Sequence, residues 1–178
     1  AAAITLVLPM SNTALAAAAT AAAAKPALNT TTAAPASLAT SPLVAAWPGA
    51  YGGLPPFDKV KVADFQAALE YGMAEELREV EAIANNPAPP TFDNTIAQLE
   101  RGGRALHRVM ACYGVWSSNM SSSEFQVIER EMGPKLAAFG DEITQNEALF
   151  ARIRSVYESP AKAQLNAAQQ RLVWKYHN

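Results

Sequence analysis

Large apolar residues recur at spacings of three and four from Phe65 to Tyr176, and this periodicity restricts the fold more than any other feature of the chain. In a helix such spacing gathers the apolar side chains on one face, whereas a half-buried strand requires apolar and polar residues to alternate. No segment shows that alternation. The sequence therefore predicts an all-α fold, built as an array of amphipathic helices.

Local signals divide the array into segments. A first helix is expected from Phe65 to about Asn85, where an Asn-Asn-Pro sequence ends it. A second begins after Thr91, a plausible N-cap, and its apolar stripe continues to Trp116. Gly102 and Gly103 interrupt that stripe at a cost of about 1 kcal/mol each relative to alanine, and allow close packing or a bend.

Three further helices complete the pattern. Ser121-Ser122-Ser123 is expected to cap a helix from Phe125 to Ile143, with a kink at Pro134. A shorter helix carries Leu149, Ile153 and Val156, and Asn166 is expected to cap the segment Ala167 to Tyr176. The last periodic residue is followed by no helix terminator, so we expect truncation within this helix.

The first 41 residues differ from the rest in composition, because Lys25 is their only charged residue. The apolar run from Ile4 to Met10, followed by Ala14-Leu15-Ala16, is typical of the end of a signal peptide and is too short to span a bilayer. We expect a partial signal peptide at 1–16, a disordered Ala/Thr/Pro linker at 17–41 and a helical domain at 42–178. The predicted location is periplasmic or secreted, and an Ala/Thr linker without a leader is the alternative.

Between the linker and the first helix, Pro42 to Pro56 has turn chemistry without periodicity. We expect this arm to lie across the helices, anchored by Trp47, Tyr51, Leu54 and Phe57. The net charge of −2, with acids and bases interspersed after Asp58, argues against strong attraction to nucleic acid. No stable membrane insertion and no nucleic-acid partner are expected.

Catalytic chemistry finds little support in the residues. A His-Glu-x-x-His zinc motif is absent, and His107 and His177 are too far apart in sequence to suggest a shared metal site. Cys112 lies five residues from His107, about 140 degrees around a helix, so the two cannot form a nucleophile and base pair. Cys112 is better interpreted as a small buried hydrophobe, and as the only cysteine it excludes an intramolecular disulfide.

Other polar and aromatic groups are expected to be structural. Ser117-Ser118 lacks a nucleophile motif, and Gly52-Gly53 belongs to no phosphate-binding pattern. The acidic group formed by Glu75, Glu76, Glu79 and Glu81 fits a solvated helix face. Tyr113, Trp116, Trp174 and Tyr176 fit core positions better than a stacking surface. No catalytic, cofactor-binding or metal-binding residue is therefore predicted in this chain.

Several segments resemble the thimet oligopeptidase family of zinc peptidases, and the peptidyl-dipeptidase branch more than oligopeptidase A. The most specific is Pro90-Thr-Phe-Asp-Asn-Thr-Ile96 with Leu99-Glu100. The others are Leu54-Pro-Pro-Phe-Asp-Lys-Val-Lys, Glu70-Tyr-Gly-Met-Ala-Glu75, Glu81-Ala-Ile-Ala-Asn-Asn-Pro87, Tyr113-Gly-Val-Trp-Ser-Ser-Asn119 and Leu136-Ala-Ala-Phe139. Ala67 and Gly102-Gly103 depart from residues common in the family, Pro and Ser-Gly respectively.

The resemblance implies an N-terminal fragment of a mostly helical zinc metallopeptidase that is several times longer. It implies a deep cleft that admits short peptides, from whose C-terminus dipeptides are released. The zinc ligands, His-Glu-x-x-His and a downstream Glu, would lie beyond Asn178, in a catalytic domain that is the expected partner of these helices in cis.

Two alternatives remain open at this point. One is an exported helical binding module without enzymatic activity, and the other is a stand-alone remnant that hydrolyses nothing. If the helices normally pack against a larger domain, their exposed apolar stripes predict that the isolated chain aggregates or behaves as a molten globule.

Overall fold

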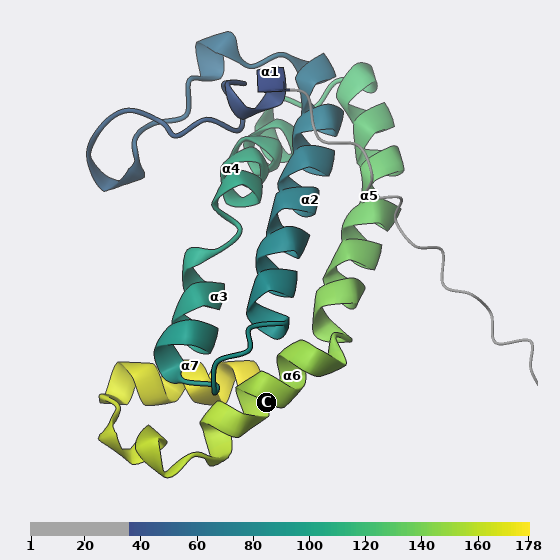
Figure 1. The fold of residues 1–178 in the computed structure, drawn as a ribbon. Coiled ribbons are helices and arrows are strands. Elements are labelled where there is room, and N and C mark those ends of the chain that lie inside the picture. Colours follow the sequence, from purple (N-terminus) through teal and green to yellow (C-terminus); the bar gives the residue numbers. More distant parts are fainter. Residues whose placement is uncertain (1–35) are drawn as a thin grey trace, which may run out of the picture. The chain divides into compact units, whose positions relative to one another are not determined.

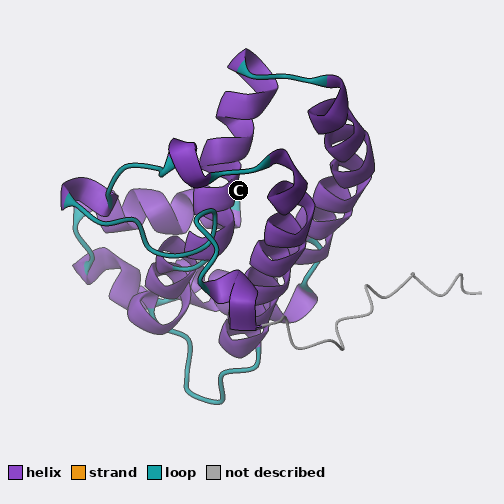
Figure 2. Cartoon of the chain, turned by 90° about the horizontal axis from the view of Figure 1, so that it is seen from above, coloured by secondary structure: helices purple, strands orange, loops and turns teal. Residues whose placement is uncertain are grey.

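A computed structural model describes residues 36–178, all of which lie in helices, turns and loops (Figures 1 and 2). The predicted all-α fold is confirmed for this part of the chain. The expected signal peptide and most of the expected linker lie outside the described residues. Within the end of that linker, α1 (Ala36–Ala39) forms a single helical turn.

The long helices follow the predicted segments. Helix α2 (Phe65–Ala84) is followed by a π-helical turn, η4 (Phe92–Ile96), which leads directly into α3 (Ala97–Arg101). The chain then forms α4 (Arg104–Asn119), α5 (Ser123–Thr144), α6 (Glu147–Glu158) and α7 (Ala167–His177). Short 3-10 turns are η1 (Ala50–Gly52), η2 (Phe57–Lys59), η3 (Val62–Asp64) and η5 (Pro160–Gln164).

Side-chain caps start several of these helices, as their sequences predict. The Thr91 hydroxyl accepts from the Asn94 N–H while the Asn94 side chain accepts from the Thr91 N–H, which is a reciprocal capping box. Asn166 and Gln169 repeat the arrangement at α7, and Ser122 caps α5. Each cap satisfies an N–H that the first turn leaves without an intrahelical partner.

A first core fills the space between the N-terminal part of α2, helix α4 and helix α5. Its largest fully buried members are Phe65, Phe125, Leu69 and Met132, and the arm adds Leu43 and Val44. Phe65 contacts the rings of Tyr113, Trp116 and Phe125 edge-on, with ring centroids 5.2 to 6.1 Å apart. Helices α2 and α4 approach closely at Gly72, where an added Cβ would lie 2.8 Å from the Leu106 Cα.

A second core joins the C-terminal part of α2 to η4, α6 and α7, which crosses the end of the array in Figure 1. It is formed by Val80, Ile83, Ile96, Leu149, Ile153, Val156 and Val173. Helix α2 contributes buried residues to both cores without a break, and Ile143 at the end of α5 also packs against both. Its residues up to Leu77 belong to the first core, and Val80 and Ile83 belong to the second.

The segment expected as one helix from Thr91 to Trp116 is two helices, which corrects the sequence interpretation. Gly102 is extended (ψ 177°) and Gly103 is left-handed (φ 67°), so the chain breaks between α3 and α4. Glycine adopts the left-handed conformation without the steric penalty of a Cβ. By contrast, α5 is continuous through Pro134, and the expected kink there stays a prediction.

The arm is anchored less fully than expected. Trp47 is half-buried and its Nε1–H donates to the Pro42 carbonyl at 3.1 Å, while Leu54 is 83% exposed and Phe57 is 42% exposed. Phe57 nevertheless contacts the Trp116 ring at 6.0 Å. Leu54 is therefore not an anchor, and among the arm's described side chains burial rests on Leu43, Val44 and Trp47. The prediction for the Tyr51 side chain lies outside what the structure describes.

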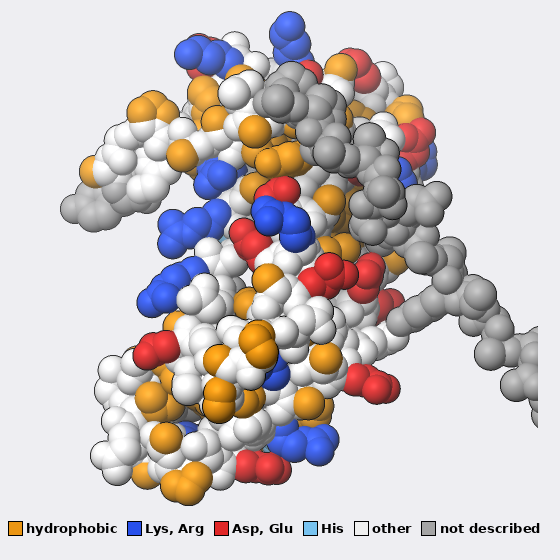
Figure 3. Space-filling view, in the orientation of Figure 1, with side chains coloured by type: hydrophobic (Ala, Val, Ile, Leu, Met, Phe, Trp, Pro, Cys, Tyr) orange, Lys and Arg blue, Asp and Glu red, His pale blue; other side chains and the backbone are white. Residues whose placement is uncertain are grey.

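No helix among residues 36–178 is long and apolar enough to cross a membrane. On the face drawn in Figure 3, basic and acidic side chains are scattered among apolar and other groups. The expected lack of a nucleic-acid partner stays a prediction.

Candidate functional site

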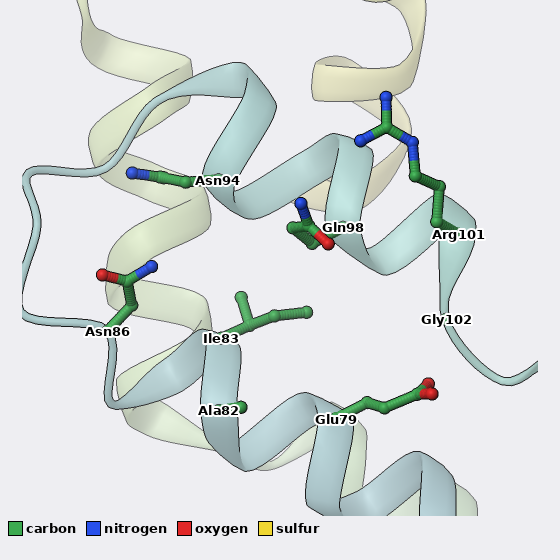
Figure 4. Close-up of a pocket in the computed structure, with 8 residues that line it drawn as sticks. All are labelled: Glu79, Ala82, Ile83, Asn86, Asn94, Gln98, Arg101 and Gly102. Atoms are coloured by element: carbon green, nitrogen blue, oxygen red, sulfur yellow. The ribbon is translucent and has the colours of Figure 1, made fainter.

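A groove of about 360 Å³ separates the C-terminal half of α2 from η4 and α3 (Figure 4). Ile83 and Gln98 face each other across it, with Asn86 and Asn94 at one end and Glu79, Arg101 and Gly102 at the other. The lining combines the uncharged polar side chains of Asn86, Asn94 and Gln98 with one acidic residue, one basic residue and the apolar side chains of Ala82 and Ile83. Ile83 and Asn86 belong to the family-like segment 81–87, and Asn94 belongs to the segment 90–96. These two segments therefore lie on opposite walls of one groove.

The side chain of Asn94 already makes four hydrogen bonds. Its side-chain oxygen accepts from the Thr91 N–H, the Thr95 hydroxyl and the Arg152 guanidinium, and its amide nitrogen donates to the Pro89 carbonyl at 2.9 Å. The segment that carries the most specific resemblance, Pro90 to Ile96, thus has a structural role in this chain. It fixes the start of η4 and one end of the groove.

Behind that end of the groove lies Arg152 of α6, which is only 7% exposed. Its guanidinium donates to the Asn86 carbonyl at 2.6 Å, the Ala88 carbonyl at 3.1 Å and the Asn94 side chain at 3.1 Å. Its Nε is buried and has no hydrogen-bond partner among residues 36–178. A buried charge is tolerated when hydrogen bonds replace its hydration, and here neutral oxygens of the loop after α2 provide them.

Sequence reasoning missed Arg152, although a signal was present. Leu149, Arg152, Ile153 and Val156 have the spacing of one helix face, so Arg152 interrupts an apolar stripe. A lone charge in such a stripe indicates a buried, hydrogen-bonded group rather than a solvated one. The identity of its partners depends on the loop 85–91, whose path has no periodic pattern.

At the other end of the groove, two glutamates of α2 contact the break between α3 and α4. The Glu79 carboxylate accepts from the Gly103 N–H at 2.7 Å. The Glu76 carboxylate lies against Gly103, where an added Cβ would be 2.7 Å from the Glu76 Cδ. The solvated-face interpretation holds for Glu81, which is exposed, and for Glu75, which pairs with Arg78 at 2.6 Å. It is wrong for Glu76 and incomplete for Glu79.

Burial is the main influence on Glu76 and raises the pKa of its carboxyl, with a smaller rise from Glu79 that a nearby His107 opposes. Burial also raises the pKa of Tyr176 on α7, and its hydrogen bond to Glu100 adds to that rise. The carboxyl of Glu76 and the hydroxyl of Tyr176 are thus both half-buried polar groups. His107 itself is exposed on α4.

The other residues that the sequence singles out do not come together. Cys112 is fully buried in the first core, as predicted, and burial raises the pKa of its thiol. His177 of α7 stacks on Tyr157 of α6, with ring centroids 3.9 Å apart. Ser117 donates to Glu129 at 2.5 Å, and Gly52 and Gly53 form a turn with positive φ beside Trp47.

The aromatic residues divide between core and surface. Trp116 is buried and Tyr113 is half-buried in the first core, which agrees with the core interpretation. Tyr176 packs against the second core. Trp174 is 58% exposed, so the core interpretation is wrong for that residue. It occupies the outer face of α7, beyond the stripe that buries Val173.

A zinc ion does not fit residues 36–178. No group of three or more His, Cys, Asp or Glu side chains in this part of the chain is arranged to hold a metal. We therefore derive no metal-dependent step from these residues.

The chain is similar to bacterial peptidases. Dipeptidyl carboxypeptidase of Salmonella typhimurium is 33% identical over 123 residues, which cover 69% of this chain and 18% of that protein. The enzyme of the same name from Escherichia coli is 32% identical over the same lengths. Oligopeptidase A of Salmonella typhimurium is 25% identical over 120 residues. No protein-family model matches the chain.

These similarities define the class: the chain is a helical relative of bacterial peptidases. More narrowly, it fits a fragment of the family that contains dipeptidyl carboxypeptidase and oligopeptidase A, which confirms the resemblance found in the sequence. The higher identity is to the dipeptidyl carboxypeptidases. The chain spans only 18% of the length of the curated relatives that it matches.

Proposed function

We propose that this chain is the N-terminal, non-catalytic helical part of an exported zinc oligopeptidase of the peptidyl-dipeptidase type. The observation that supports this most is the similarity to dipeptidyl carboxypeptidases over 69% of the chain, combined with a share of only 18% of their length. The absence of a His-Glu-x-x-His motif from the sequence fits a part of such an enzyme that lies outside its catalytic centre.

In this proposal the helices form a wall of the enzyme rather than a reaction centre. The two cores make the wall stiff enough to exclude folded proteins, while short peptides reach the cleft. The zinc ion, held by residues outside this chain, would polarise the scissile carbonyl and acidify its water. The proposal that the protein is exported depends on the sequence pattern of a partial leader in residues 1–16, which precede the described part of the chain.

The test is a peptidase assay of the complete gene product on a short N-terminally blocked peptide, with and without a zinc chelator. The 178-residue chain is assayed beside it. We expect the complete protein to release C-terminal dipeptides only with metal, and the chain alone to be inert. Cleavage by the chain alone would place chemistry in these helices. An inert complete protein, whose coding sequence lacks His-Glu-x-x-His, would support the binding-module or remnant alternatives.

A further inference from the structure

The two cores meet at a level where α2 is continuous but the segment formed by α3 and α4 is not. Leu77 is the last α2 residue of the first core and Val80 the first of the second. Opposite them the chain breaks between α3 and α4 at Gly102-Gly103, and α5 gives way to α6 at Gln145-Asn146. In Figure 1 the break between α3 and α4 lies beside the length of α2, whereas the turn between α5 and α6 lies near the end of α2.

The conformation of the break at Gly102-Gly103 is stabilised by residues of another helix, α2. Helix α4 has no side-chain cap of its own. Instead Glu79, 24 residues earlier in the sequence, accepts the Gly103 N–H at 2.7 Å, and Glu76 lies against Gly103 one turn away on the same face of α2. A carboxylate that accepts a backbone N–H at the start of a helix is favoured by the hydrogen bond and by the helix dipole.

We propose that Gly102-Gly103 is a joint between the two cores and that Glu79 is its latch. With the Glu79 to Gly103 bond formed, α3 and α4 keep one angle. Without it, the two glycines permit α3 to tilt against α4, because they lack the Cβ that restricts φ and ψ elsewhere. Since α2 is unbroken, the joint permits a tilt and not a separation of the cores.

The joint controls the groove beside it. Glu79 and Gly102 both line that groove, and Gln98 and Arg101 lie on α3, the element that would tilt. Release of the latch therefore changes the spacing between α3 and the C-terminal half of α2. Glu79 is exposed, and within residues 36–178 its one side-chain hydrogen bond is that to Gly103, so the latch can open without exposing either core.

The test compares Glu79→Ala with Glu75→Ala in the 178-residue chain by amide hydrogen exchange. Both substitutions remove a glutamate from α2, but Glu75 pairs only with Arg78 and does not touch the break. We expect Glu79→Ala to accelerate exchange of amides 103–106 roughly tenfold or more, with the rest of α2 and α5 unchanged. Glu79→Gln, whose amide oxygen can accept the same bond, should restore most of the protection.

A second measurement reports on the tilt itself. Spin labels on cysteines introduced at Ala137 of α5 and Ala168 of α7, both exposed, give the distance distribution between the two halves. The native Cys112 is fully buried and should not take the label. We expect a broader distribution in Glu79→Ala than in Glu75→Ala. Unchanged exchange at 103–106, an unchanged distribution, or loss of protection throughout both cores would each overturn the proposal.

Discussion

The guanidinium of Arg152 on α6 donates to the side-chain oxygen of Asn94 in η4, 58 residues earlier in the chain. The same guanidinium holds the carbonyls of Asn86 and Ala88, so one side chain joins α6, η4 and the loop between α2 and η4. That loop contains three prolines and few apolar side chains to bury. Its path therefore depends on hydrogen bonds more than on packing.

Arg152→Met should destabilise the fold strongly. The substitution keeps a long apolar side chain but leaves three buried or half-buried oxygens without their donor, and we expect a loss of about 2 to 4 kcal/mol in the free energy of unfolding. Arg154→Met, on the exposed side of the same helix, is the matched control and should cost about 1 kcal/mol or less. Urea denaturation measures both, and equal losses would mean that the buried hydrogen bonds contribute little.

Alanine substitutions at two glycines should change the stability of the fold in opposite directions. At Gly72 an added Cβ would lie 2.8 Å from the Leu106 Cα, so Gly72→Ala must push α2 and α4 apart and should cost about 1 to 3 kcal/mol. At Gly114, within α4, nothing lies within 4 Å, so Gly114→Ala should stabilise by about 0.5 to 1 kcal/mol. Thermal unfolding of both variants checks the pair. A stabilising Gly72→Ala would contradict the close approach of the two helices.

The raised pKa of Glu76 predicts a pH dependence of stability. Because the pKa is higher in the folded chain than its ordinary value of 4.5, the folded state binds the proton more tightly than the unfolded state. The contribution of Glu76 is therefore most favourable below pH 4.5 and is lost as the pH rises through the folded pKa. Glu76→Gln should be more stable than the parent near neutral pH, and the difference should shrink as the pH falls through this window.

The control for this titration is Glu81→Gln, an exposed position on the same helix. Its stability relative to the parent should change little over the same pH range. Chemical denaturation at several pH values gives the two difference curves. A Glu76→Gln difference that stays constant from neutral pH to below pH 4.5 would show that the folded and unfolded pKa values are equal.

Cys112 should resist thiol reagents while the chain is folded. The side chain is fully buried, and burial raises the pKa of its thiol, which lowers the reactive thiolate fraction. We expect reaction with an aromatic disulfide reagent to follow the rate of unfolding and to become rapid in denaturant. Fast labelling in buffer would show that the first core opens locally.

Periodicity predicted the elements that bury large apolar faces. Helices α2 and α5 follow the stripes that begin at Phe65 and Phe125, and the caps at Thr91, Ser122 and Asn166 follow from side chains that accept nearby N–H groups. These features depend on residues within one or two turns. Local sequence is therefore enough to place them.

The features that sequence reasoning missed depend on distant residues. Glu76 of another helix occupies the space that a side chain at Gly103 would fill, and the Gly103 N–H donates to Glu79, 24 residues away in the sequence. The partners of Arg152 are set by the packing of α6 on the loop after α2. The exposure of Trp174 likewise reflects which face of α7 meets the second core. None of these relations has a repeating pattern in the sequence.

The passage of α2 through both cores affects the order in which the chain can fold during synthesis. Helix α2 leaves the ribosome before α4, α5, α6 and α7, so its apolar side chains have no partners until those helices follow. The part near Phe65 is covered first, by α4 and α5, and the part near Ile83 is fully covered only when α6 and α7 emerge. Limited proteolysis of ribosome-bound chains ending after α5 should therefore cleave α2 near Ile83 and spare it near Leu69.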